Sequence, residues 1–191
     1  MSSSNNINEI LLCLKNTYSS ADKKIRKESE QKLDILKNQN IIEFSTQLIM
    51  LIKSNSPDID NNLKLSIILY LKRCLKEKIE KEEINKTQSE QLIQQFIITL
   101  VYPSLSKKHL ENLSDVFTMV LEISPEETLI GIIKYINQEI SSMPLGSVNG
   151  VISILLSIIS SKNLTKKKFY TSIRNKFRNG FFYGREFILR I

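Results

Sequence analysis

Apolar residues recur along this chain with the period of an α-helix, and the segments that carry them come in pairs. One such segment covers about residues 21–38. Its small and apolar residues share one face, namely Ile25, Ser29, Leu33 and Leu36. The opposite face is almost entirely charged, which predicts a helix lying at a surface with one buried side. The chain must therefore bury a series of one-sided helices against one another.

The same period predicts eight helices, arranged as four helical hairpins. The expected ranges are 7–18, 21–38, 41–53, 59–79, 88–102, 106–122, 125–141 and 147–161. Turn signals separate several of these helices, including Pro57, Pro103 and Pro125. With only 5 Gly and 4 Pro in the chain, an all-β fold with many tight turns is disfavoured.

Equivalent positions in the second helix of each hairpin lie roughly 40 residues apart, the length of HEAT-type helical repeats. The positions compared are Ile25, Leu63, Leu110 and Val151. Hairpins of this kind bury their second face only by stacking. We therefore predict an all-α fold, specifically an α-α superhelix (a HEAT- or armadillo-like solenoid) of about four helical hairpins. A closed four-helix bundle fits eight helices and this drifting repeat poorly.

The helix expected at 59–79 differs from the others because its apolar residues extend well around the cylinder. Leu63, Ile67 and Leu71 define one face, and Leu65 and Leu69 widen it. A helix that is apolar over most of its circumference is usually contacted from several sides. We expect it to lie between its hairpin partner and both neighbouring repeats.

The formal net charge of +7 is a property of the C-terminal segment. Residues 166–191 hold one acidic residue, Glu186, and eight basic residues: Lys166, Lys167, Lys168, Arg174, Lys176, Arg178, Arg185 and Arg190. The rest of the chain has equal numbers of acidic and basic residues. We therefore expect no nucleic-acid binding by the body of the protein.

Aromatic residues are interleaved with these basic residues, including Phe169, Tyr170 and Phe177. Four interpretations of this tail stay open. It can bind single-stranded nucleic acid by stacking and phosphate neutralisation, or an anionic membrane surface. It can also form the next helix of the solenoid and cover an exposed apolar end. Finally, it can be non-native sequence from a misread end of the gene.

Residues with catalytic or metal-binding chemistry are sparse. Cys13 and Cys74 fall in apolar helical patterns, so we expect buried free thiols. The one histidine, His109, stands at a predicted helix start, where a surface position is expected. No pattern predicts a metal site, a cofactor or a catalytic group, and we interpret the chain as a non-enzyme. Residues 1–8 lack a signal-sequence pattern, and no apolar run reaches the ~18 residues of a membrane span, so a soluble intracellular protein is expected.

Residues 9–79 resemble the N-terminal domain of the importin-β (karyopherin) superfamily. The positions that carry the resemblance are Leu11, Leu12, Asp22, Arg26, Ser29, Glu30, Leu33, Lys64, Leu65, Ser66, Leu71, Lys72 and Arg73. Residues 87–160 resemble the two repeats that follow in the same family. Lys64 stands where the family usually has Arg, and Arg73 where it usually has Asn. The chain is thus similar to a divergent or truncated member.

The resemblance implies a role in nuclear transport. In the family, inner helices of the N-terminal repeats bind the Ran GTPase in its GTP form. Outer helices contact phenylalanine-glycine nucleoporins, and later repeats help to hold protein cargo. Receptors of this kind move between nucleus and cytoplasm. The candidate contacts for an acidic partner surface are all basic residues: Lys64, Lys72, Arg73, Lys76, Lys107 and Lys108. The alternative interpretation of each is a solvated helix charge.

These patterns divide the chain into four segments. We expect a disordered N-terminus at 1–6, an importin-like domain of two repeats at 7–80, HEAT-like repeats three and four at 81–161, and the basic aromatic tail at 162–191. The alternative function is a generic HEAT-repeat interaction scaffold whose basic tail binds nucleic acid.

Overall fold

The computed structural model describes residues 3–103, 105–139 and 142–160, and the described residues contain no strand. They form eight α-helices and one short 3-10 helix: α1 (Ser3–Ser19), α2 (Lys23–Gln39), α3 (Ile41–Lys53), α4 (Asn61–Glu80), α5 (Lys86–Leu100), α6 (Lys107–Ile123), α7 (Glu126–Glu139), η1 (Leu145–Ser147) and α8 (Val148–Ser160). The prediction of an all-α fold is confirmed.

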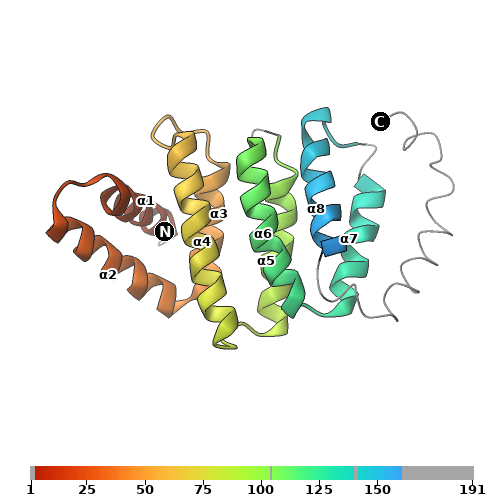
Figure 1. Ribbon diagram of the computed structural model, residues 1–191, viewed down its shortest axis with the longest axis horizontal. Coiled ribbons are helices and arrows are strands. Elements are labelled where there is room, and N and C mark those ends of the chain that lie inside the picture. Colours follow the sequence, from red (N-terminus) through yellow and green to blue (C-terminus); the bar gives the residue numbers. More distant parts are fainter. Residues whose placement is uncertain (1–2, 104, 140–141, 161–191) are drawn as a thin grey trace.

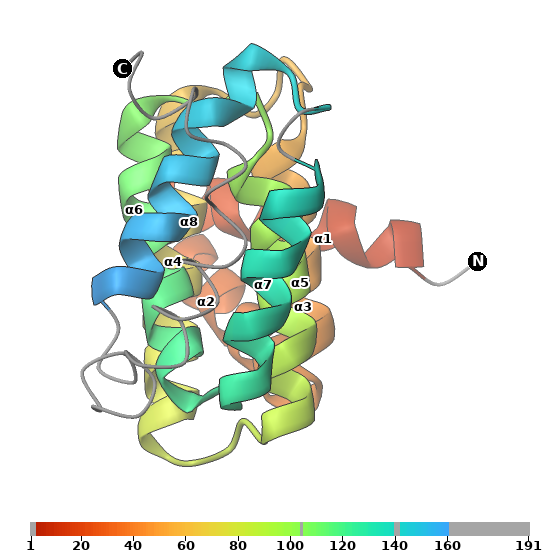
Figure 2. The same ribbon diagram turned by 90° about the vertical axis from the view of Figure 1, so that its right-hand side faces the viewer.

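Successive helices pair into four hairpins that stack side by side (Figure 1). The second helices α4, α6 and α8 form one layer, and each packs against the next. The first helices α3, α5 and α7 form the other layer, as the view along the array shows (Figure 2). This arrangement is the α-α solenoid that the repeat spacing predicts.

Most helix starts are fixed by polar caps that the sequence places there. Asp22 accepts from the backbone N–H of Lys24 at 2.7 Å, and Asn40 caps α3 in the same way. Asn85 forms a reciprocal capping box with Gln88 at the start of α5. Because Asp60 caps α4, that helix begins at Asn61 rather than 59. α1 begins at Ser3 instead of the predicted residue 7, since polar residues extend a helix without adding to its apolar pattern.

One continuous apolar core runs through the array. Phe44 of α3 packs edge-on against Tyr70 of α4, with ring centroids 6.2 Å apart, and Phe96 packs in the same way on Phe117 between α5 and α6. Cys13 and Cys74 are free and buried, which confirms the expectation for both thiols. None of the helices in the described residues is long and apolar enough to cross a membrane.

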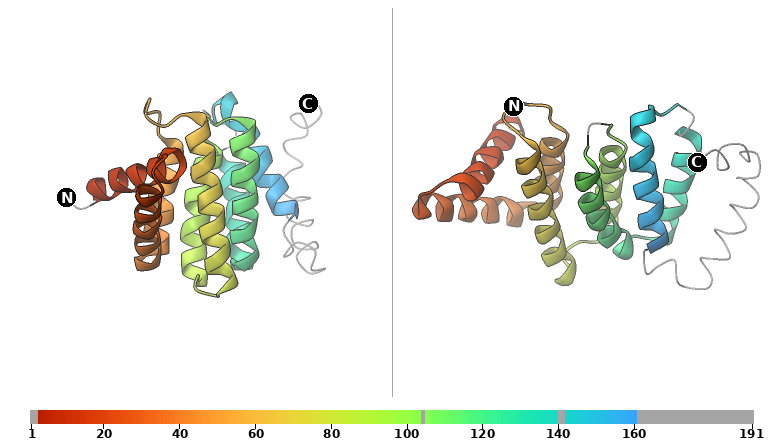
Figure 3. Two further views of the ribbon diagram at one scale, coloured as in Figure 1. Left: turned by 60° about the vertical axis from the view of Figure 1, so that its left-hand side comes forward. Right: turned by 45° about the horizontal axis from the view of Figure 1, so that its top comes forward.

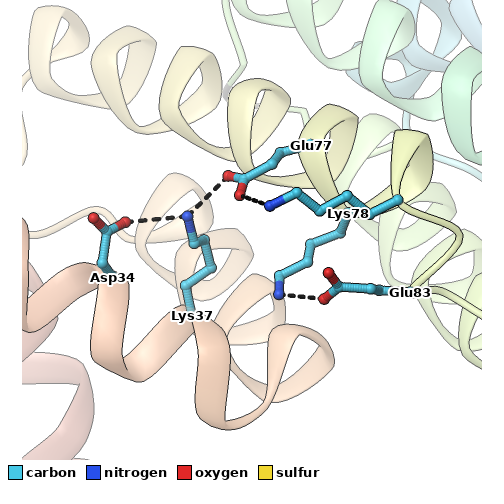
Figure 4. Close-up of polar contacts among 6 residues, drawn as sticks. Asp34, Lys37, Glu77, Lys78 and Glu83 are labelled. Atoms are coloured by element: carbon cyan, nitrogen blue, oxygen red, sulfur yellow. Dashed lines mark hydrogen bonds and ion pairs between the residues drawn. The ribbon is translucent and has the colours of Figure 1, made fainter.

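The first hairpin is joined to the second partly through a buried lysine. α2 runs at an angle away from α4 and approaches it at its C-terminal end (Figures 1 and 3). There, Lys37 of α2 is buried, and its Nζ lies 2.9 Å from Glu77 Oε2 of α4 and 3.1 Å from Asp34 Oδ1 (Figure 4). Lys81 Nζ donates to the other Glu77 oxygen at 2.8 Å. Burial alone lowers the pKa of Lys37, but these carboxylates raise it above its ordinary value.

As expected, α4 contacts its hairpin partner α3, α1 of the preceding hairpin and α6 of the next one. One stripe of its surface nevertheless stays open. Leu69 is 47% exposed and Leu65 is half-buried. By helical spacing, both lie on the side of α4 away from the buried stripe of Ile67, Ile68 and Leu71. The tertiary arrangement thus leaves part of the apolar circumference of α4 open.

Two glycines of the fourth hairpin provide a matched test of the packing. A Cβ on Gly150 of α8 would collide with the backbone carbonyl of Leu100 at the end of α5, whereas one on Gly131 of α7 meets nothing. Gly150→Ala should therefore lower the free energy of unfolding by about 2 kcal/mol. Gly131→Ala should raise it by about 0.5–1 kcal/mol, because alanine favours the helix. Urea denaturation of both variants checks this, and equal effects would contradict the close approach of α8 to α5.

The Lys37–Glu77 bridge predicts a pH-dependent contribution to stability. Hydrogen bonds from Lys81 and then Lys37 lower the pKa of Glu77 from 4.5 to about 2. A carboxyl whose pKa is lower in the folded state stabilises it fully above the unfolded pKa and ceases to do so as the pH falls toward the folded one. Because Glu77 is partly exposed, Glu77→Gln should cost only about 1 kcal/mol at pH 7. The difference should shrink between about pH 4.5 and pH 2. Urea midpoints across this range measure it, with Glu80→Gln, in an exposed pair, as the control.

Candidate partner-binding face

One face of α4 combines apolar and basic side chains. Leu65, Leu69, Lys72, Arg73 and Lys76 follow one another at intervals of three or four residues, so they share one side of the helix. Leu69, Arg73 and Lys76 of this set are exposed. This α4 face (the five residues above) therefore combines exposed apolar area with positive charge.

Arg73 is held over an aromatic ring. Its guanidinium carbon lies 5.0 Å from the ring centroid of Tyr70, which is itself buried against Phe44. Burial raises the pKa of the Tyr70 hydroxyl, so the ring stays neutral under Arg73. A cation–π contact of this kind orients the guanidinium without neutralising it. Arg73 therefore keeps its charge available at the surface.

Lys72 is already engaged within the chain. Its Nζ lies 2.7 Å from Asp115 Oδ2 of α6, and the bridge ties the two neighbouring second helices together. Lys76 faces Glu80 at 3.8 Å, one turn further along α4. Both pairs are at least one-third exposed, and exposed pairs contribute roughly 0.2–1 kcal/mol each. An acidic partner would therefore have to replace Asp115 and Glu80, at little energetic cost.

Lys64, expected among the partner contacts, is buried. It shares the buried stripe of α4 with Ile67, Ile68 and Leu71, at spacings of three, four and seven residues. The side chain at this position therefore faces neighbouring helices instead of solvent. Its match to the family pattern has a packing explanation, and we exclude it from the α4 face.

Lys107 and Lys108 open α6 and are exposed, as predicted. Lys107 pairs with Glu111 of its own helix at 3.9 Å. α4 and α6 run side by side in the same direction, so the two lysines lie next to the first turn of α4. That places them roughly 16 Å along the helix axis from Lys72 and Arg73. The sequence candidates thus form two separate groups.

The expectation that His109 is a surface residue is wrong. The ring is 3% exposed, and its Nε2 lies 3.0 Å from the backbone carbonyl oxygen of Asn61 in α4. The Nε2–H donates this bond, and the buried Nδ1 has no hydrogen-bond partner. The histidine is buried because the first turn of α6 packs on the first turn of α4, which directs its neighbours Lys107 and Lys108 outward. Its role is to join the two helices.

A second concave surface, between α5 and α7, is not predicted by the sequence analysis. This α5–α7 groove has a volume of about 620 Å³ and is mainly apolar. Its lining includes Ile93, Ile97, Ile98, Gly131, Ile132 and Tyr135, together with the acidic residues Glu90 and Glu127. Thr128 Oγ1 of α7 donates to Glu90 Oε1 of α5 at 3.1 Å across it. Gly131 in mid-helix leaves open space where a side chain would stand, and it is the one sequence signal that could have indicated the groove.

Comparison of the chain with protein-family models, with curated proteins and with solved structures gives no match. The similarity to the importin-β superfamily therefore stays a prediction that rests on residue spacing. Among the residues that the structure describes, no three His, Cys, Asp or Glu side chains are grouped so that they could hold a metal ion.

His109 and Lys108 are neighbours in sequence, but His109 is buried and Lys108 is exposed, and this difference in burial can be tested directly. His109→Ala removes a buried ring and its hydrogen bond to Asn61, and should lower the free energy of unfolding by about 2 kcal/mol. Lys108→Ala, one residue earlier on the exposed side, should change it by less than about 0.5 kcal/mol. Thermal or urea unfolding of the two variants is the measurement. A His109 variant as stable as the parent would place the ring at the surface after all.

Proposed function

We propose that this chain is a protein-binding solenoid that acts as the N-terminal part of an importin-β-type transport receptor and binds Ran in its GTP form. The observation that carries the proposal is the α4 face, where Arg73 and Leu69 are exposed one helical turn apart. An exposed leucine beside an oriented, unneutralised guanidinium suits a protein partner with an acidic and an apolar side chain close together.

The residues shared with the family also support the proposal, because several of them build the first two hairpins. Asp22 caps α2, and Ser29 and Leu33 are buried on the side of α2 that packs on α1. The backbone carbonyl of Ser66 accepts a hydrogen bond from Tyr18 at the end of α1, at 3.5 Å. The spacing that suggests the family is thus the spacing that these hairpins need in order to pack.

We assign the nucleoporin contact to the α5–α7 groove on the opposite layer. Ile98 is 48% exposed and Tyr135 is 39% exposed there, and Gly131 adds open space where a side chain would stand. A shallow apolar groove of this size suits a phenylalanine side chain followed by a small residue. Ran on the α4 face and nucleoporins in the groove would then bind to different layers of the solenoid.

The proposal is tested by measuring binding of the purified full chain to Ran loaded with a GTP analogue or with GDP. The GTP form should bind at least about tenfold more tightly. Lys76→Glu on the α4 face should weaken this binding by about tenfold, since it places a like charge opposite an acidic partner. Lys134→Glu makes the same charge change on α7, in the other layer, and should leave binding unchanged.

Equal affinity for both nucleotide forms, or no binding to either, would remove the Ran assignment. Equal weakening by Lys76→Glu and Lys134→Glu would remove the α4 face from it. Salt-sensitive binding to RNA that is lost when Lys166, Lys167 and Lys168 are changed to Gln would instead favour the alternative scaffold with a nucleic-acid-binding tail. That tail lies outside the described residues.

A further inference from the structure

The α5–α7 groove continues toward the C-terminal ends of the two helices that form it. Ile98 of α5 and Tyr135 of α7 line the groove and also line an adjoining hollow of about 300 Å³. The hollow extends to Tyr102, just after α5, and to Glu139 at the end of α7. Because the groove and the hollow share residues, they form one continuous surface. The stretch from Glu90 to Ile98 alone covers roughly 12 Å along the axis of α5, enough for several residues of a peptide.

The charge of this surface is concentrated at one end. Glu90, near the start of α5, and Glu127, in the first turn of α7, both line the groove there. No lysine or arginine of the described residues lines that part. The other end has one charge of each sign, because Lys53 and Glu139 both line the adjoining hollow. A cationic group on a ligand is therefore attracted to the acidic end.

Glu90 is held in place but has no cationic partner. Thr128 Oγ1 donates to Glu90 Oε1 at 3.1 Å, and Glu90 is half-buried. Among the residues that the structure describes, neither Glu90 nor Glu127 forms an ion pair. A ligand that covers this carboxylate removes its water, which costs free energy unless the ligand supplies a positive charge. The groove therefore favours a cationic ligand over a neutral one.

The open space beside Gly131 lies close to this carboxylate. Gly131 follows Thr128 by three residues, so the space is roughly 5 Å along α7 from the hydrogen bond between Thr128 and Glu90. In an extended peptide, side chains two residues apart point to the same side and are roughly 7 Å apart. A peptide that fills the space with an apolar side chain can thus direct its side chain two residues away toward Glu90.

We propose that the α5–α7 groove selects peptide segments that carry lysine or arginine two residues from a phenylalanine, which rests on the proposed use of the groove for a partner's phenylalanine. The phenylalanine fills the space beside Gly131, and the carboxylates of Glu90 and Glu127 bind the cation. A phenylalanine flanked only by glycine and serine would leave Glu90 covered and unpaired. An acidic residue at the same position would be repelled, so the groove discriminates against some segments as well as for others.

The proposal is tested by titrating the purified full chain with three synthetic peptides. Each has one phenylalanine in a glycine–serine background, and the residue two positions away is lysine, glutamine or glutamate. The NMR shift of the Gly131 backbone amide reports binding in the groove. The lysine peptide should bind about fivefold more tightly than the glutamine peptide at low salt, the upper range for an exposed ion pair. The glutamate peptide should bind most weakly, and high salt should reduce both differences.

Variants locate the effect on the acidic end of the groove. Glu90→Gln keeps an oxygen that can accept from Thr128 but removes the charge. It should therefore abolish most of the advantage of the lysine peptide and leave binding of the glutamine peptide unchanged. Glu43→Gln removes an exposed carboxylate of α3 outside the groove, and as the matched control it should leave the advantage intact. Gly131→Leu fills the open space and should weaken binding of all three peptides.

The possible outcomes distinguish the two proposals about the groove. If no peptide shifts the Gly131 amide, the nucleoporin assignment and the charge requirement both fail. If the peptides bind equally, or if Glu90→Gln leaves the advantage of the lysine peptide intact, the charge requirement alone fails. Shifts of the groove amides with chain concentration, without peptide, would show that a second copy fills the groove. Peptide binding seen only after Lys166, Lys167 and Lys168 are changed to Gln would assign the groove to the chain's own tail. Either of these last two results overturns the assignment to a separate partner.

Discussion

Stacking of the second helices is the constraint on which the rest of this structure depends. α4, α6 and α8 each have apolar side chains on more than one side, and a single hairpin has only one partner helix to cover them. The neighbouring hairpins supply the other surface. His109 of α6 fixes the relative position of two of these helices. Its ring is buried, and its hydrogen bond to the backbone of Asn61 sets how α6 lies along α4.

The first hairpin shares the apolar core and has a polar contact to α4 in addition. α2 diverges from α4, so apolar contact between these two helices is limited, and the buried Lys37 reaches Glu77 near the point where they approach. A buried ion pair is a weak source of stability, because desolvation offsets most of the attraction. The ion pair does, however, require a particular distance and direction between its two charged groups. We infer that Lys37 helps to orient the first hairpin, which also joins the apolar core through Ile10, Leu14 and Leu33.

The sequence predicts the helices well because caps and apolar period are local signals. Residues 41–53 are found as predicted, bounded by Asn40 and Ser54. The sequence predicts the contacts between hairpins poorly, because these contacts depend on how helices that are distant in the chain align. No local signal places Lys72 of α4 beside Asp115 of α6, or buries His109. Lys64 is the instructive case: its charge suggests exposure, whereas its spacing from Ile67 and Leu71 indicates the buried stripe, and the spacing decides.

The same alignment determines what the α4 face can recognise. Lys72 and Lys76 have acidic neighbours, whereas Arg73 rests on a neutral ring and Leu69 is exposed one turn before it. A partner that offered charge alone would compete with Asp115 and Glu80 for a small gain. A partner that also covers Leu69 buries apolar area that stays exposed among the residues the structure describes. If the α4 face binds a partner as proposed, selectivity should therefore depend on the pairing of Leu69 with Arg73 more than on the number of lysines around them.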